Sequence, residues 1–164
     1  MIFELEGFYI DLVESKDLNE VEKVYNSNKD FLLSHMDTEQ ITGEWVFQEI
    51  ESMRKAGFYS CKIVEIGTKK IIGIIDFKAG EETYLSLLMI RNEFKNRGLG
   101  KSIFRAFEEY IRTLKSKCIR IDVATHYDNI VTDFWVQNQF VEFDHINLNW
   151  TGKTIPAIAM KKLL

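Results

Sequence analysis

A short basic segment that contains two glycines is the part of this sequence best suited to bind an anion. Its residues are Lys95, Asn96, Arg97, Gly98, Leu99, Gly100, Lys101 and Ser102. The first turn of a helix leaves about four amides without partners and carries roughly half a positive charge. Glycine lets an anion come close to the backbone, and the lysine and arginine side chains add mobile positive charge. The segment therefore predicts a phosphate site on the amides of residues 96–101.

The residues on both sides of this segment predict a strand before it and a helix after it. Residues 83–90 are rich in β-branched and apolar side chains, as in a buried strand. Beyond residue 98, apolar residues recur at i, i+3 and i+4 spacing, which is typical of an amphipathic helix. They are Leu99, Ile103, Ala106, Phe107, Tyr110, Ile111 and Leu114. Strand, glycine segment and helix together make an anion site.

Three kinds of phosphate-binding loop differ in the spacing of their glycines. The Walker loop, Gly-x-x-x-x-Gly-Lys-Ser/Thr, is matched at residues 100–102, but Lys95 occupies the place of its first glycine. The dinucleotide fingerprint needs a glycine where the packed helix face has Ile103. A third pattern, Gln/Arg-x-x-Gly-x-Gly/Ala after a strand, is matched by residues 95–100 with lysine in the first place. In this the chain resembles the GCN5-related N-acetyltransferase (GNAT) family, although a plain glycine-rich helix start and a nucleotide site stay open as alternatives.

A later segment and the order of elements extend the resemblance over nearly the whole chain. The family's second motif, roughly Asn-x-x-Ala-x-x-aromatic-Tyr-x-x-x-Gly-Phe, is similar to residues 129–140, with one residue fewer in its loosest part. The matching residues are Asn129, Thr132, Phe134, Trp135, Gln139 and Phe140. We predict the order β-α-α-β-β-β-α-β-α-β-β, with the polar residues 26–40 as a loop between the first two helices. The resemblance implies one α/β domain over residues 1–164, with a mixed sheet of about seven strands and two splayed central strands.

Composition and charge exclude several other classes of protein. The 164 residues are 46% hydrophobic with a net charge of −4, which argues for a globular domain and against nucleic acid as the main partner. No apolar run approaches the length of a membrane span, and the first residues have no basic n-region, so we expect a cytoplasmic protein. Two cysteines and three histidines show no metal-ligand spacing, so we expect no metal. We expect a monomer or a homodimer.

The resemblance implies that acetyl-CoA is the co-substrate. Its pantetheine arm would pair with the open edge of the central strand, at the backbone of Leu88, Met89 and Ile90. An amide there, at Met89 or Ile90, would polarise the thioester carbonyl. The pyrophosphate would lie on the amides of residues 96–101, and Asn129 and Trp135 of the second motif would also contact the coenzyme.

The implied reaction is direct attack of a primary amine on the thioester in a ternary complex, which gives an amide and free CoA. It needs a base for the incoming ammonium, and the family positions for that base correspond to Tyr84 and Ser86, both poor bases at neutral pH. Glu82 and His126 are the other candidates, against the simpler explanations of a solvated turn and a structural histidine. Trp135 replaces the tyrosine that usually serves as the acid, and an indole cannot release a proton.

Two functions are therefore compatible with the sequence. The first is an N-acetyltransferase that acts on a small molecule or peptide amine, which we expect to be slow unless Tyr127 or another group substitutes for the missing acid. His35 and Asp37 would then border the acceptor cleft. The second is a non-catalytic acyl-CoA-binding or sensor domain, which the poor bases and Trp135 favour.

Overall fold

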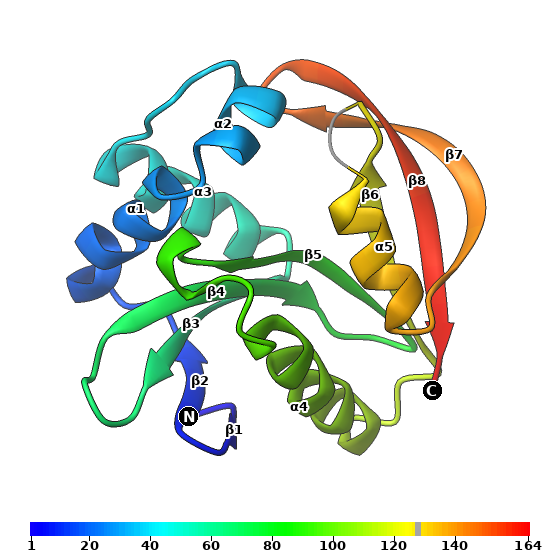
Figure 1. Ribbon diagram of the computed structural model, residues 1–164, viewed down its shortest axis with the longest axis horizontal. Helices are drawn as coiled ribbons and strands as arrows, with labels where there is room; N and C mark the ends of the chain where they lie inside the picture. The colour runs from blue at the N-terminus through cyan, green and yellow to red at the C-terminus, as the bar shows by residue number, and fades with distance from the viewer. Residues whose placement is uncertain (127–128) are drawn as a thin grey trace.

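The computed structural model describes residues 1–126 and 129–164, which form a sheet with helices on both faces (Figure 1). The sheet has eight strands in the order β1-β2-β3-β4-β5-β6-β8-β7. Their bounds are β1 Phe3–Leu5, β2 Phe8–Leu12, β3 Tyr59–Glu65, β4 Ile71–Lys78, β5 Glu82–Ile90, β6 Cys118–Ala124, β7 Val141–Trp150 and β8 Lys153–Leu163. Neighbouring strands are antiparallel except for β5 and β6, which are parallel. This mixed sheet confirms the predicted fold class.

Five α-helices among the described residues cover the sheet in two groups. Their bounds are α1 Leu18–Asn26, α2 Lys29–Met36, α3 Gly43–Lys55, α4 Leu99–Thr113 and α5 Ile130–Gln137. One buried cluster joins α4 and α5 to the sheet, and a second cluster joins α1, α2 and α3 to the opposite face. Two 3-10 turns, at Ser15–Asp17 and Asn92–Phe94, precede α1 and α4. None of these helices is long and apolar enough to cross a membrane.

The amphipathic pattern after the glycine segment does form a helix, α4. Its buried side chains are Ile103, Phe104, Phe107 and Ile111. Leu114, the last member of the predicted stripe, is exposed because the helix ends one residue before it. Thr42 is the N-cap of α3, since its hydroxyl accepts a hydrogen bond from the Trp45 amide at 3.2 Å.

Two elements differ from the sequence prediction. Residues 26–40, predicted as a loop, contain the helix α2, and a short strand, β1, makes the eighth strand. A helix of eight residues, half of them polar, shows little periodicity, so local pattern alone does not reveal α2. Tertiary contacts hold it instead: Leu32 is completely buried, and the Asn28 side chain donates hydrogen bonds to the carbonyls of Val24 and Ile90. β1 pairs with β2 across a turn at Gly7, whose φ is 82°.

The two central strands diverge after a short contact. β5 and β6 pair at Glu82–Cys118, Thr83–Ile119 and Tyr84–Arg120, and no further pairs join them. Beyond that point β5 continues beside β4, and β6 continues beside β8. The β4–β5 register also shifts by one residue, because Asp76 pairs with Leu87 whereas Phe77 pairs with Leu85. This leaves Ser86 as a β-bulge at the start of the open edge. The splay confirms the predicted separation of the central strands.

Candidate functional site

The first turn of α4 has the geometry of an anion site. Gly98 precedes the helix with φ of 73°, in the left-handed region that favours glycine, and a Cβ added there would meet no atom within 4 Å. The amide of Ser102 bonds the Gly98 carbonyl at 3.2 Å and closes the first turn. Among the described residues, no acceptor pairs with the amides of residues 96–101. These amides are therefore available to a phosphate.

Basic side chains surround this turn. Lys95 is exposed at this turn; desolvation lowers its pKa, while the charge of Asp30 of α2 acts in the opposite direction. The guanidinium of Arg97 lies over the ring of Phe94, 5.5 Å from its centroid. Lys101 is exposed on the first turn of the helix. The unpaired amides and these cations together favour an anion with more than one negative charge.

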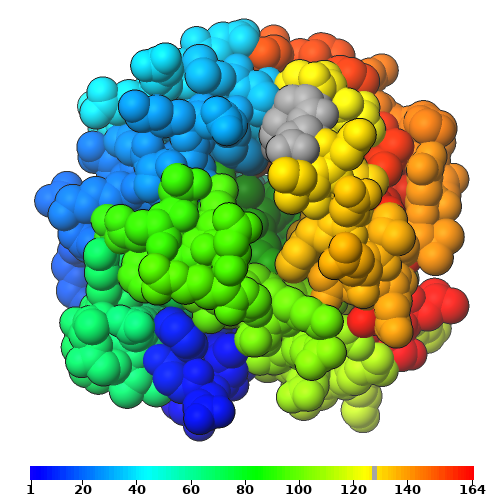
Figure 2. All heavy atoms as spheres, viewed as in Figure 1, coloured from blue at the N-terminus to red at the C-terminus, as the bar shows by residue number. Residues whose placement is uncertain are grey.

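A hollow lies beside the turn, and Figure 2 shows it between the start of α4, α5 and α2, with β5 at its base. Gly100 lies at its wall. A Cβ at Gly100 would be 3.5 Å from the Phe134 ring of α5 and 3.6 Å from the Ile90 side chain of β5. The glycine segment, the second motif and the end of the central strand therefore meet at one place.

The open edge of β5 presents particular backbone groups to this gap. The Arg91 amide bonds the Ile72 carbonyl of β4 at 2.7 Å, and successive amides of a strand point to opposite edges. The Met89 amide therefore points to β4, whereas those of Leu88 and Ile90 point to the gap. The Ile90 carbonyl accepts a bond from Asn28 at 3.1 Å. The geometry favours Leu88 and Ile90 over Met89 as donors to a bound thioester.

The structure does not bring the sequence-predicted catalytic residues together. Glu82 begins β5 at the closed end of the splay, and His126 follows β6 at its open end, so the length of β6 separates them by about 20 Å. The Glu82 carboxylate lies 2.5 Å from Lys161 Nζ, and this hydrogen bond lowers the pKa of Glu82. Glu82 therefore lies at the closed end of the splay, before the strands separate.

His126 and His35 belong to a contact between α2 and the end of β6. His126 Nε2 lies 2.8 Å from the Ser34 carbonyl, and the two imidazole rings are 6.1 Å apart. Burial lowers the pKa of His35 to about 4, so this histidine is neutral at physiological pH. Asp37 ends α2 and pairs with Lys153 of β8 at 2.6 Å. These residues connect α2 to the β7–β8 hairpin at the open end of the splay.

Trp135 lies in the core and not at the gap. It is 7% exposed and packs edge-on against Phe104, Phe134 and Phe140. Its neighbour Phe134 is half-buried and faces Gly100 instead. Asn129 is exposed at the start of α5, and Tyr127, the proposed substitute acid, lies outside the described residues. Packing therefore accounts for the tryptophan at the motif's tyrosine position.

A comparison with known protein families identifies the family that shares these features. The model of the acetyltransferase (GNAT) family matches residues 21–137, which include the splay, the glycine segment and α5. The chain belongs to the GNAT family. Membership implies acyl-CoA-dependent acetyltransferase activity, and the family binds acetyl-CoA. No curated protein matches the sequence of this GNAT chain.

Solved structures share the GNAT fold over the full length of the chain. An acetyltransferase from Thermus thermophilus is 19% identical with a TM-score of 0.73, and 96% of this chain covers 97% of it. A ribosomal-protein-alanine N-acetyltransferase from Brucella melitensis is 17% identical with a TM-score of 0.69, and 95% of this chain covers 99% of it. A spermidine N-acetyltransferase from Vibrio cholerae, in complex with CoA and spermine, is 14% identical with a TM-score of 0.74, and 97% of this chain covers 96% of it. At these identities the likeness shows the fold alone.

Sequence reasoning missed a carboxylate in β6 of this GNAT chain. Asp122 accepts hydrogen bonds from Arg120 Nε at 3.1 Å and from its Nη2 at 3.5 Å, and its side chain is 8% exposed. Burial, with the charge of Asp122 as the next cause, raises the pKa of Tyr84. The signal was present, because β6 alternates apolar residues with Arg120 and Asp122. Such alternation places polar side chains on the face opposite the core.

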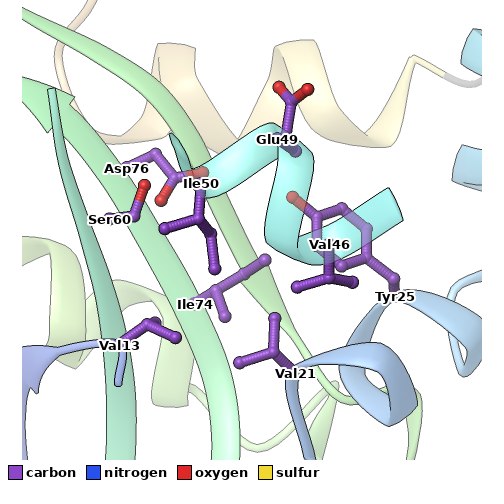
Figure 3. A pocket seen from close by; sticks show the side chains of 9 residues that line it. All are labelled: Val13, Val21, Tyr25, Val46, Glu49, Ile50, Ser60, Ile74 and Asp76. Carbon is purple, nitrogen blue, oxygen red and sulfur yellow. The ribbon is translucent and has the colours of Figure 1, made fainter. Parts of the chain in front are cut away.

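A second buried polar group is the carboxylate of Asp76, which lies between the strands β3 and β4 on one side and the helices α1 and α3 on the other. It lines a cavity just large enough for about one water molecule (Figure 3). The cavity is lined by Val13, Val21, Tyr25, Val46, Glu49, Ile50, Ser60, Ile74 and Asp76. Figure 3 shows the Asp76 carboxylate beside the Ser60 hydroxyl. Burial, with the charge of Glu49 as a smaller cause, raises the pKa of Asp76 to about 7. Among the described residues, no group of three His, Cys, Asp or Glu side chains could hold a metal.

Proposed function

We propose that this GNAT protein is an N-acetyltransferase. It moves the acetyl group of acetyl-CoA to a primary amine of a small molecule or peptide by direct attack within a ternary complex. The observation that carries the proposal is the divergence of β5 and β6 beside the unpaired amides of residues 96–101. The structural neighbour with spermine bound supports an amine as the acceptor class.

The coenzyme would bind mainly to backbone groups. The amides of residues 96–101 would hold its diphosphate, with Lys95, Arg97 and Lys101 as surrounding cations. Ser102 would contribute its hydroxyl at the same turn. The free edge of β5 would pair with the pantetheine arm, as a further strand pairs with a sheet edge. Asn129 and Phe134, at the start and middle of α5, would line the opposite wall.

The proposed chemistry depends on the backbone amides at the open edge of β5. An amide of Leu88 or Ile90 would stabilise the negative charge that develops on the thioester oxygen as the amine attacks. The bond to sulfur then breaks, and the thiolate leaves with its electron pair. Because the pKa of a thiol is about 8.5, the thiolate is an adequate leaving group at neutral pH. The reaction therefore does not need a proton from Trp135.

Acetylation with a panel of amines tests the proposal. We would incubate the protein with acetyl-CoA and small-molecule or peptide amines, measure free CoA thiol, and identify the product by mass spectrometry. The expected result is thiol release that needs both substrates, and a product heavier by one acetyl group. Propionyl-CoA and succinyl-CoA, offered separately, measure acyl specificity.

Three results would contradict the proposal in different ways. Tight CoA binding without transfer across the whole panel would indicate the acyl-CoA-binding or sensor domain. Absence of CoA binding, in a folded protein, would contradict the site itself. Binding of Mg-ATP that excludes CoA would instead establish a nucleotide site on Gly100, Lys101 and Ser102.

A further inference from the structure

In the described part of the chain, the buried cluster of α1, α2 and α3 leaves one half of the sheet uncovered, on the face opposite α4 and α5. The cluster under α1, α2 and α3 includes residues of β3, β4 and β5, but none of β6, β7 or β8. In β6, Ile119, Ile121 and Val123 belong to the α4–α5 cluster. Because side chains alternate along a strand, Arg120 and Asp122 lie on the uncovered face. This face is the proposed acceptor side of the splay, whereas the proposed coenzyme site lies beside α4.

Tyr84 shares this face and lies where the strands separate. It forms the last β5–β6 pair with Arg120, and its ring contacts Phe58, with 6.0 Å between centroids. Asp122 is the next residue on the same face of β6, just past the last pair. The charge of Asp122 acts on the Tyr84 hydroxyl, which burial also affects. The register therefore places the Tyr84 and Asp122 side chains at neighbouring positions on one face, at the apex of the splay.

Two other carboxylates near the splay, Glu82 and Asp76, lie away from the start of the gap. Glu82 precedes the point of divergence and is paired with Lys161. Asp76 lies one strand away and is enclosed under α3. The charged groups that face Asp122 are Arg120, which bonds it directly, and Lys161, which lies with Arg120 over the ring of Phe143. Within the described part of the chain, Asp122 is thus the carboxylate beside the start of the gap.

We propose that Tyr84 and Asp122 together accept the proton of the incoming ammonium, an inference that rests on the proposed acetyl transfer. An N–H bond of the ammonium breaks, and its proton passes to the Tyr84 oxygen. The hydroxyl proton of Tyr84 passes at the same time to the Asp122 carboxylate. The neutral amine forms the C–N bond to the thioester carbon, and the C–S bond breaks with its electron pair on sulfur. The second N–H proton of the attacking nitrogen passes to this thiolate, so that the products are the neutral amide and the CoA thiol. Tyr84 is the catalytic residue that touches the acceptor, and Asp122 acts through it, held in place by Arg120.

The test compares Asp122→Asn and Tyr84→Phe with the parent enzyme, using an acceptor identified in the amine panel. We expect Asp122→Asn to lower kcat/KM by about 10²-fold or more, the usual contribution of a general base. CoA affinity stays unchanged, because the coenzyme site uses other residues. The double variant should be no worse than the more impaired single variant, since both residues serve one proton path.

A pH profile separates this role from a structural one. The defect of Asp122→Asn should shrink as pH approaches the pKa of the acceptor, because neutral amine is then already present. It should also shrink for a fluorinated analogue of the same acceptor, whose ammonium is more acidic. Asp122→Glu, which keeps the carboxylate, should recover part of the activity. A misplaced strand would lower activity equally under all of these conditions.

Asp144→Asn is the matched control, since Asp144 is an exposed carboxylate of β7 in the same sheet. Its kcat/KM should stay within about twofold of the parent value, as expected for a surface substitution. Parent activity in Asp122→Asn, or a defect independent of pH and acceptor basicity, would overturn the inference while the acetyl transfer stands. Silence of the parent enzyme across the panel would overturn both.

Discussion

The two sides of the β5–β6 gap are built in different ways. The proposed coenzyme side would use backbone groups of one continuous stretch, residues 88–102, whose shape follows from a strand, a glycine and a helix start. The proposed acceptor side would use side chains from separate elements: Tyr84 of β5, Asp122 of β6, and His35 with Asp37 at α2. The backbone side depends on local conformation, whereas the side-chain side depends on how distant elements pack. Substitutions on the two sides should therefore fail for different reasons.

The largest effect is expected from Gly98→Glu. A side chain at φ of 73° strains the backbone, and a carboxylate within about 4 Å of the diphosphate would cost about 4 kcal/mol, or about 10³-fold in CoA affinity. Isothermal titration with CoA measures the loss. Gly7→Glu is the matched control, because Gly7 also has positive φ and open space but lies in the β1–β2 turn. Equal CoA affinity in folded Gly98→Glu would contradict the backbone site.

Gly100→Glu should also lower CoA affinity, but through charge and not through backbone strain. A Cβ at Gly100 makes ordinary contacts with Phe134 and Ile90, so the backbone is not strained. The added carboxylate would enter the hollow and repel the phosphates, and CoA affinity should fall by about 10²-fold or more. Gly100→Ala, measured in the same titration, should retain most of the affinity. If alanine is as harmful as glutamate, steric contact with the walls matters more than charge.

A smaller effect, on stability, is expected from Asp76→Asn on the helix-covered side. The pKa of Asp76 is about 7 in the folded protein and near 3.8 when unfolded, so the native state binds the extra proton between these values. The free energy of unfolding contributed by this group is therefore present at low pH and lost as pH rises toward 7. Relative to Asp76→Asn, the parent should lose about 2 to 3 kcal/mol between pH 5 and 7.

Urea denaturation of both proteins at several pH values measures this difference. His35 titrates in the opposite sense, since its lowered pKa makes stability fall as pH drops below about 6.5. Because both proteins contain His35, its contribution cancels in the comparison. Parallel curves for parent and Asp76→Asn would show that Asp76 is ionised in the fold at neutral pH.

Trp135→Tyr should affect stability more than turnover. The indole is buried among three phenylalanine rings, so the smaller ring leaves a cavity and brings a hydroxyl into the core, at a cost of about 1 to 3 kcal/mol. We expect a lower thermal midpoint and a nearly unchanged kcat. A clear rise in kcat would show that this position reaches the thiolate and that its protonation limits the rate.

The smallest effect is expected from Arg97→Gln. The guanidinium is exposed above Phe94, where solvent screens its charge, so CoA affinity should fall by about threefold to tenfold. The loss should decrease as salt concentration rises. A loss as large as that of Gly98→Glu would mean that side-chain charge, and not the backbone amides, carries the coenzyme site.

Several features of the fold could be predicted from local pattern. The apolar stripe of α4 is long and regular, and the run at residues 83–90 has the composition of a buried strand. α2 could not be predicted in this way, because its stability comes from Leu32 and from the bond between Asn28 and the β5 carbonyl of Ile90. A helix of eight residues has too little periodicity to outweigh its polar composition.

The candidate site likewise contains some residues that local sequence predicts and others that only the fold reveals. Residues 95–102 could be assigned because an anion site on backbone amides needs only glycine, positive charge and a helix start in order. Asp122 was not assigned, although it interrupts an apolar strand, because nothing local reveals that its strand parts from β5 at that level. Trp135 matches a motif position, but only packing against Phe104 and Phe140 shows that its ring enters the core.

The sequence by itself therefore determined the strand, turn and helix start on which the proposed coenzyme site rests, since these are set by residues within a few positions of one another. The tertiary structure decided which carboxylate faces the gap, which aromatic ring is buried, and how α2 meets the hairpin. These are contacts between residues far apart in the chain, and their energies depend on distances that spacing along the chain does not specify.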